Sequence, residues 1–234
     1  MTRPDEVVAP ARGAMTEEGP PVRLAVLDYR VSNLRSATKA LELLGADVRV
    51  TGDPADVPGA DAVVLPGVGH FGEAMRRIRE HGLDRAVLRA ADEGVPILGF
   101  CVGLQLLFAE SEESPGVAGM GVLPGPVRRL RTDRKLPHIG WSEVAWSPES
   151  GLGPESGRAA DATYYFVHSF APEPEDEALV LGRARHGVEF CAAAGRPGVT
   201  GLQFHPEKSS AAGLALLGRW LAGIRAATGA ATAT

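Results

Sequence analysis

The chain has 234 residues, which is enough for one large α/β domain or two small ones. Its composition, with 44% hydrophobic and 23% charged residues, is that of an ordinary soluble globular protein. A net charge of −5 gives no electrostatic basis for binding nucleic acid or an anionic membrane. No apolar run approaches the ~20 residues that span a bilayer. Without an apolar signal segment at the N-terminus, we expect a cytoplasmic location.

The two ends of the chain differ in composition from the rest. Residues 1–21 are rich in proline, glycine, alanine and acidic residues, so we expect a disordered leader there. Residues 227–234 consist of alanine, threonine and glycine and are predicted to form a flexible tail. The part between them, residues 22–226, shows no internal repeat and no linker, and we interpret it as a single domain.

Strand and helix patterns alternate over the first half of this domain. Short apolar runs predict strands at residues 22–27, 47–51, 62–65 and 95–100. Helical spacing of apolar residues predicts helices at 33–44, at 71–91 with a break near Gly82, and from 104 onward. Repeated βα units indicate an α/β fold with an open, mostly parallel sheet flanked by helices.

The second half of the domain begins with a different pattern. Residues 116–196 are rich in glycine, proline and turn residues, with short strands at 164–167 and 178–184, so we expect an antiparallel β-rich insertion. Residues 199–204 resemble another core strand. An amphipathic helix over 211–227 is predicted to close the domain.

One of the two cysteines lies in a turn suited to a nucleophile. Gly99-Phe100-Cys101-Val102-Gly103 follows an apolar strand and precedes a helix, in the form G-x-C-x-G of a cysteine nucleophile elbow. The backbone N–H of Val102 at the helix start would stabilise an oxyanion, and the same field favours the Cys101 thiolate. A buried structural cysteine in a βα turn is the alternative. Cys191 has no such context and is expected to be structural.

A nucleophilic thiol needs a general base and a group that orients it. Among the six histidines, His205 ends an apolar strand in Gln203-Phe204-His205-Pro206-Glu207. Pro206 favours extended geometry at His205, and positions i and i+2 of an extended chain share a face. Glu207 is therefore predicted to orient the ring, unless this is a strand-end histidine followed by a solvated glutamate. If the strands before Cys101 and before His205 are parallel, these two residues would meet at the carboxyl edge of the sheet.

The turn Pro66-Gly67-Val68-Gly69 also follows a strand. Its glycines permit unusual backbone angles and close approach to a ligand, so Gly67, Val68 and Gly69 are candidates for a second oxyanion element. A tight βα turn with no further role explains the same residues.

Two further segments offer polar groups to a substrate. Gln105 lies one helical turn after Cys101 within an apolar run, so it is a candidate ligand, or else a helix-surface glutamine. His168 and Ser169 end the strand Tyr165-Phe166-Val167-His168-Ser169 and are candidates for substrate binding, or else for packing and loop capping. We expect neither a metal nor a cofactor.

Taken together, these motifs resemble the class I glutamine amidotransferases over nearly the whole chain from Val22 to Ile224. Within that class, further segments are similar to the glutaminase subunit of imidazole glycerol phosphate synthase. They are Asp28-Tyr29-Arg30-Val31-Ser32-Asn33-Leu34, Pro137-His138-Ile139-Gly140-Trp141, Tyr165–Phe170 and Gln203–Ser209. The chain departs from the usual pattern at Arg30, where glycine is common, and at Ser142, a position often held by asparagine.

The resemblance implies a reaction and a partner. Cys101 would attack the carboxamide of glutamine, with His205 and Glu207 completing a catalytic triad, and a thioester would then be hydrolysed. The ammonia would pass to a (β/α)₈-barrel cyclase subunit in a heterodimer, which forms imidazole glycerol phosphate and aminoimidazole carboxamide ribotide in histidine biosynthesis. Positions that match the family's subunit contacts are Asn33, Trp141 and Lys208.

Three alternatives remain open at this point. The chain could be a glutaminase that serves another ammonia-using synthase, such as those for pyridoxal phosphate, anthranilate or purines. It could act alone as a thiol hydrolase or peptidase, or be a non-catalytic binding subunit. The segments Pro137–Trp141 and Tyr165–Phe170 favour the histidine pathway over the first alternative.

Overall fold

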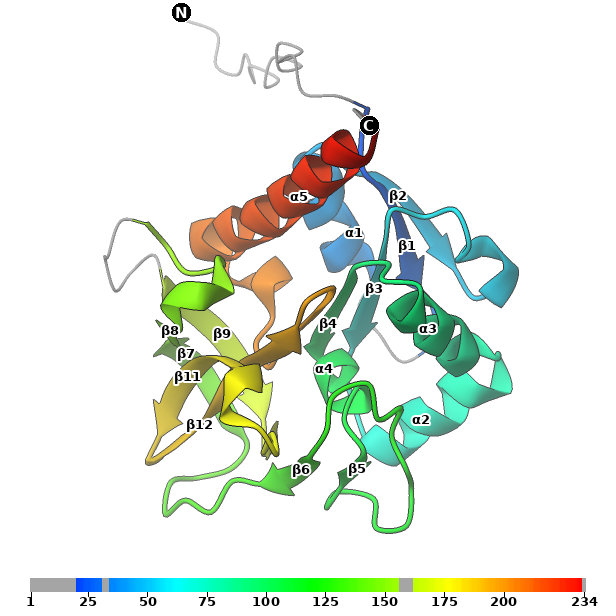
Figure 1. Ribbon diagram of the computed structural model, residues 1–234. Helices are drawn as coiled ribbons and strands as arrows, with labels where there is room; N and C mark the ends of the chain where they lie inside the picture. Colours follow the sequence, from blue (N-terminus) through cyan, green and yellow to red (C-terminus); the bar gives the residue numbers. More distant parts are fainter. Residues whose placement is uncertain (1–19, 31–33, 156–161, 233–234) are drawn as a thin grey trace, which may run out of the picture.

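The computed structural model describes residues 20–30, 34–155 and 162–232. An eight-stranded sheet with the order β2-β1-β3-β4-β13-β12-β11-β8 forms its centre (Figure 1). Five neighbouring strands run parallel: β2 (Asp47–Thr51), β1 (Arg23–Leu27), β3 (Ala62–Gly67), β4 (Ile97–Cys101) and β13 (Val199–Leu202). This confirms the predicted α/β class with an open, mostly parallel sheet.

Helices cover both faces of the parallel strands (Figure 1). On one face lie α1 (Leu34–Leu43) and α5 (Ser210–Thr232), and on the other α2 (Phe71–Glu80) and α3 (Leu83–Asp92). Side chains of a strand alternate between faces, so Val64 packs with the first pair of helices while Val63 and Leu65 pack with the second. Within the part of the chain that the structure describes, no helix has the length and apolarity to cross a membrane.

Two helix boundaries differ from those that the sequence predicts. The helix α4 (Val102–Leu106) begins directly after Cys101 rather than at Leu104, because the sharp turn at the strand end initiates it despite the weak helix propensity of valine and glycine. The helix α5 continues past Ala226 to Thr232, where we expected a flexible tail. The predicted break near Gly82 is present, with Gly82 at a φ of 68° between α2 and α3.

The remaining strands form the insertion and the far side of the central sheet. In the insertion, β7 (His138–Glu143) pairs antiparallel with β9 (Thr163–His168), and β10 (Phe170–Pro172) pairs antiparallel with β6 (Pro126–Arg129). Antiparallel strands also extend the central sheet: β12 (Val188–Arg196), β11 (Val180–His186) and β8 (Ala145–Trp146). These pairings confirm the expected antiparallel character. One pair, β5 (Glu110–Ser111) with β6, is parallel.

Short 3₁₀ turns lie between these elements, at Pro54–Asp56, Pro148–Ser150, Glu177–Leu179 and Pro206–Lys208. The third of these replaces the start of the strand predicted at 178–184, which begins only at Val180. Residues 1–19 of the predicted leader, Asn33 and the last two residues lie outside the described part of the chain.

Candidate active site

The carboxyl ends of three neighbouring strands meet at one edge of the sheet. Gly67 at the end of β3 lies opposite Cys101 at the end of β4. On the other side of β4, Leu202 of β13 lies opposite Phe100, so the segment that leads to His205 leaves the sheet beside Cys101. Parallel strands bring their carboxyl ends to the same edge, which is where ligands bind in open α/β folds.

The turn that carries Cys101 is strained and closely packed. Cys101 has φ 50° and ψ −108°, a backbone conformation rare for a residue with a side chain. A methyl group on Gly103 would lie 1.9 Å from the carbonyl oxygen of Leu65, and one on Gly99 would lie 2.8 Å from the carbonyl carbon of Gly103. Only glycine at these two positions lets α4 approach β3 and β4 so closely. This packing fixes the turn and holds Cys101 at the strand end.

His205 and Glu207 form a buried pair beside this turn. The Nδ1 atom of His205 lies 2.8 Å from Oε1 of Glu207, and the two side chains are 3% and 4% exposed. Because a carboxylate only accepts, Nδ1 carries the proton of this hydrogen bond. His205 is extended, as predicted, but Glu207 lies in the 3₁₀ turn Pro206–Lys208 rather than in an extended chain. The two side chains meet because the turn folds Glu207 back toward the ring.

The charge of His205 is set by opposing effects. Burial alone lowers the pKa of this ring, but hydrogen bonds that the ring donates to the Cys101 sulfur and to Glu207 outweigh burial and raise the pKa from 6.5 to about 9. Since Nδ1 is engaged by Glu207, the nitrogen left for the sulfur is Nε2. The arrangement therefore favours an imidazolium between the sulfur and the carboxylate.

A pocket of about 150 Å³ opens at this site. It contains the thiol, the imidazole ring and most of the side chains that the sequence suggested for substrate binding. The lining residues are Val68, Gly69, Cys101, Val102, Gln105, Glu113, Val167, His168, Ser169, Phe170, His205 and Lys208. The structure thus brings together, around Cys101, segments that lie far apart in the sequence.

Gly67 is the predicted oxyanion residue that does not line this pocket. A methyl group there would lie 2.6 Å from the backbone nitrogen of Gly103 and 2.6 Å from the hydroxyl of Tyr29. Gly67 therefore serves the packing of β3 against α4. The neighbouring Gly69, at a φ of 95°, does line the pocket and has the backbone freedom that the sequence suggested.

Tyr29 stabilises the end of β3, just before the loop that contains Gly69. Its side chain is fully buried, and its hydroxyl donates a hydrogen bond of 2.6 Å to the carbonyl oxygen of Pro66. The next residue, Arg30, has a φ of 63°, a left-handed conformation that favours glycine.

His168 lies in the pocket wall with both ring nitrogens engaged. Nδ1 donates to the carbonyl oxygen of Phe170 at 2.9 Å, and Nε2 lies 3.2 Å from Nδ1 of His138. Burial lowers the pKa of His168 to about 3, so the ring is neutral. The ring can therefore form part of the wall, but no ring nitrogen is left to hydrogen-bond a substrate.

Glu113 is a pocket residue that sequence reasoning missed. Its Oε2 accepts a hydrogen bond of 2.7 Å from the backbone N–H of Phe71 at the start of α2. It follows the short strand β5, in a stretch with three glutamates and no motif. The sequence carries no signal that separates it from Glu110 and Glu112.

The predicted interface positions lie in two places. Trp141 on β7 is 52% exposed, and its ring packs edge-on against Tyr165. Ile139, two residues earlier on the same strand, is 61% exposed. Lys208 lines the pocket. The strand β9, which pairs with β7, carries Val167 into the same pocket. Within the described residues, the exposed apolar side chains of β7 therefore adjoin the wall of the site.

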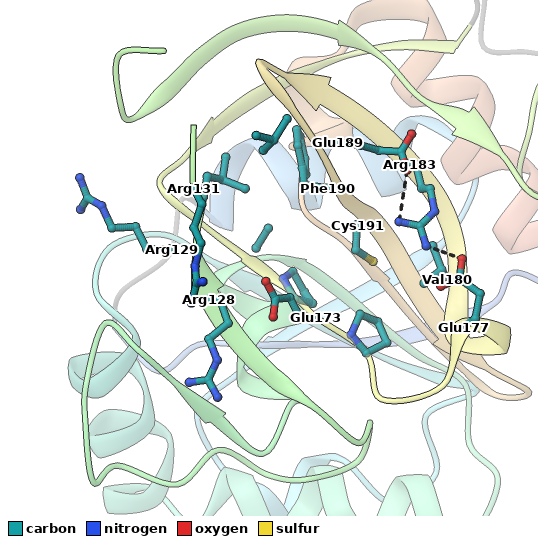
Figure 2. A pocket seen from close by; sticks show the side chains of 15 residues that line it. Arg128, Arg129, Arg131, Glu173, Glu177, Val180, Arg183, Glu189, Phe190 and Cys191 are labelled. Carbon is teal, nitrogen blue, oxygen red and sulfur yellow. Dashed lines mark hydrogen bonds and ion pairs between the residues drawn. The ribbon is translucent and has the colours of Figure 1, made fainter. Parts of the chain in front are cut away.

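Cys191 is placed quite differently from Cys101. It lies on β12 at a second cavity of about 370 Å³, among the arginine and glutamate side chains seen in Figure 2. Arg183 at this cavity is paired with Glu177 and Glu189. Burial raises the pKa of Cys191 to about 12, and its thiol lies 3.3 Å from the carbonyl oxygen of Ala193. This thiol stays protonated, and no triad residue lines the cavity.

Across the described residues, no group of three or more histidine, cysteine, aspartate or glutamate side chains could hold a metal ion. The groups that the site brings together are a thiol, an imidazole and a carboxylate, with backbone N–H groups at the start of α4 and in the loop at Gly69.

This fold is that of the class-I glutamine amidotransferases. The chain belongs to that family, "Glutamine amidotransferase class-I", whose profile matches residues 25–220. A solved "Structure of PurLQS from Thermotoga maritima" has the same fold with a TM-score of 0.68 and 22% identity, covering 90% of this chain and 99% of that one. A second, "Crystal structure of glutamine amidotransferase", has a TM-score of 0.65 and 23% identity, covering 87% and 98%.

Within the family, the chain belongs with the proteins named "Imidazole glycerol phosphate synthase subunit HisH". That of Moorella thermoacetica is 45% identical over 194 residues, covering 83% of this chain and 91% of the relative. That of Deinococcus radiodurans is 47% identical over 208 residues, covering 84% and 94%. That of Methanothermobacter thermautotrophicus is 44% identical, covering 87% and 100%. These relatives confirm the resemblance drawn from the sequence motifs.

Proposed function

We propose that this chain is the glutaminase subunit of an imidazole glycerol phosphate synthase. It hydrolyses glutamine to glutamate and ammonia and supplies the ammonia to a (β/α)₈-barrel cyclase subunit within a cytoplasmic heterodimer, in histidine biosynthesis. The observation that carries this proposal is the Cys101 elbow facing the buried His205–Glu207 pair, in a chain 45% identical to a relative named HisH.

The proposed reaction uses each of these groups in turn. The Cys101 thiolate attacks the carboxamide carbon of glutamine, and the negative charge on the tetrahedral oxygen is met by backbone N–H groups of Val102 and of Val68 or Gly69. The carbon–nitrogen bond then breaks, and His205 gives its proton to the leaving ammonia. Water attacks the thioester, His205 takes a proton from it, and the carbon–sulfur bond breaks to release glutamate.

The alternatives can be separated by one assay. Glutamate release from glutamine is measured with the purified chain alone, with the barrel cyclase, and with glutaminase-dependent synthases of other pathways. We expect the cyclase to bind the chain and raise its turnover. Absence of association with that barrel, together with activation by another synthase, would contradict the proposal. Cleavage of peptide substrates without any partner would instead identify a stand-alone thiol hydrolase.

Trp141, Lys208 and Asn33 are proposed contacts of the cyclase, and Asn33 lies outside the described residues. The exposed side chains of Ile139 and Trp141 provide an apolar surface beside the pocket that an obligate partner would cover. Such a position suits the transfer of ammonia directly from the pocket to the partner.

The pH dependence of glutamine hydrolysis is expected to have an alkaline limb set by His205. The pKa of His205 is raised to about 9 in the folded protein, so the ring is protonated at lower pH and loses its proton as pH rises through that value. A neutral ring cannot protonate the leaving ammonia, and turnover falls. Glu207→Gln removes one of the groups that raise this pKa. We therefore expect the alkaline limb of the Glu207→Gln protein to lie at lower pH than that of the wild type. Its kcat is expected to drop on the order of 10²- to 10⁴-fold.

This prediction is tested by measuring kcat across neutral and alkaline pH in the complex with the cyclase, for the wild type and Glu207→Gln. An alkaline limb at the same pH in both proteins would show that Glu207 does not set the protonation of His205.

A further inference from the structure

A second polar side chain, besides His205, reaches the sulfur of Cys101. Gln203 directly follows β13 and is fully buried. Its Nε2 atom lies 3.7 Å from Sγ of Cys101, within the range of an N–H···S hydrogen bond. Its backbone N–H donates to the carbonyl oxygen of Ala192 at 2.8 Å, so the main chain of this residue is fixed by the neighbouring strand β12.

The direction of the Gln203 amide follows from its neighbours. The side-chain nitrogen of Gln105 lies 3.1 Å from the carbonyl oxygen of Phe170, which can only accept a hydrogen bond. The same nitrogen lies 3.1 Å from Oε1 of Gln203. Gln105 thus donates twice, and Gln203 must turn its oxygen toward Gln105 and its NH₂ group toward the sulfur. These contacts leave one consistent assignment of both amides, in which Gln105 donates to Phe170 and to Gln203, and Gln203 donates to Cys101.

Such a donor matters more to a thiolate than to a thiol. A thiol sulfur is a weak acceptor, whereas hydrogen bonds to an ionised acceptor are about twice as strong as neutral ones. The low dielectric of a buried site strengthens them further. An amide held against the sulfur therefore favours the charged form of Cys101, both before attack on the substrate and when the sulfur leaves the thioester.

We propose that Gln203 is a catalytic residue that donates a hydrogen bond to the Cys101 thiolate, and that Gln105 positions it. This rests on the proposed glutaminase reaction. When water attacks the thioester, the carbon–sulfur bond breaks and the sulfur takes the electron pair. His205 accepts the proton of the water, and the Gln203 amide stabilises the departing thiolate. The nucleophile is then stabilised by two donors, the imidazolium of His205 and the amide of Gln203.

The test compares Gln203→Met with the wild type, both in a Cys191→Ser background so that Cys101 is the one remaining thiol. Alkylation by iodoacetamide is followed as a function of pH in the full chain. We expect alkylation of Gln203→Met at slightly acidic pH to slow about tenfold, with the midpoint of its pH profile displaced to higher pH. In the complex with the cyclase, kcat for glutamine is expected to fall about 10- to 100-fold with little change in KM.

Gln203→Glu provides an independent variant in case the methionine does not fold. It keeps the shape of the side chain but replaces the donor with a carboxylate, so alkylation should slow at least as much. Thr200→Val, on the strand β13 that leads to Gln203 and outside the pocket, is the matched control and should react like the wild type. The thermal unfolding midpoint identifies which variants are folded.

A folded Gln203→Met or Gln203→Glu protein with wild-type alkylation and kcat would overturn the assignment and leave Gln203 as a buried packing residue. Because alkylation needs no glutamine, its outcome is separate from the proposed function. A wild-type chain that fails to hydrolyse glutamine with the cyclase would refute the function, whereas the alkylation profiles would still decide whether Gln203 donates to the Cys101 sulfur.

Discussion

Cys101→Ala is expected to abolish glutamine hydrolysis while leaving the fold and the binding of the cyclase intact. Loss of the nucleophile of a triad reduces turnover by roughly 10⁴- to 10⁶-fold. Alanine keeps the Cβ atom, so the strained φ of 50° at this position costs about the same in both proteins. Cys101 as a whole is only 4% exposed, so removal of its thiol leaves the surface nearly unchanged. Ammonia release in the complex and the affinity for the cyclase are the two measurements.

Cys191→Ser is the matched control for this experiment. Its thiol has a pKa raised to about 12 by burial and lies at a different cavity, so the variant should hydrolyse glutamine at the wild-type rate. Hydrolysis that persists in Cys101→Ala, or disappears in Cys191→Ser, would mean that the nucleophile has been assigned to the wrong cysteine.

Gly103→Ala is expected to be the most damaging single-methyl addition in the site. The added carbon would lie 1.9 Å from the carbonyl oxygen and 2.9 Å from the carbonyl carbon of Leu65. Overpacking in a core costs about 1–3 kcal/mol and occasionally more. Here the obstacle is the backbone of a central strand, which cannot rotate away, so we expect a loss of about 3 kcal/mol or more. Displacement of α4 would also move Cys101 away from Gly69 and reduce turnover.

Urea unfolding measures the change, and Gly223→Ala is the control. Gly223 lies in α5 with open space around its Cα, so alanine there should be neutral or stabilising by up to about 1 kcal/mol. Equal stability of the Gly103→Ala protein and the wild type would show that the elbow tolerates a side chain and that its close packing is not required.

Several features of the site could be predicted from the sequence because their determinants are local. The alternation of apolar strands and amphipathic helices indicated a parallel sheet, and its strand ends indicated the edge where a site would lie. The glycines around Cys101 indicated a sharp turn. The contact of Gly99 with Gly103 arises within this strand–turn–helix unit, whereas Gly103 is restricted by Leu65 of the neighbouring strand β3. His205 and Glu207 are two residues apart, and their pairing at 2.8 Å follows from this proximity.

Other features depend on contacts between distant segments, and only the tertiary structure decided them. The strand β13 lies beside β4, although residues 102–198 separate them in the chain, and this places Gln203 against the sulfur of Cys101. The pairing of β7 with β9 places His138 against His168. The ring of His168, which the sequence suggested for substrate binding, is therefore already hydrogen-bonded. Gly67 looks like part of an oxyanion loop, yet it serves the packing of α4.

The physical reason is the same in each case. Residue type and spacing fix what a side chain can donate, accept or pack against, and whether its neighbours in the chain form a strand, turn or helix. Which partner it meets depends on the order of strands in the sheet and on how the insertion folds over its edge. Thus the sequence by itself determined the nucleophile turn and the His205–Glu207 pair. The tertiary structure decided which side chains surround Cys101 and in which direction their hydrogen bonds run.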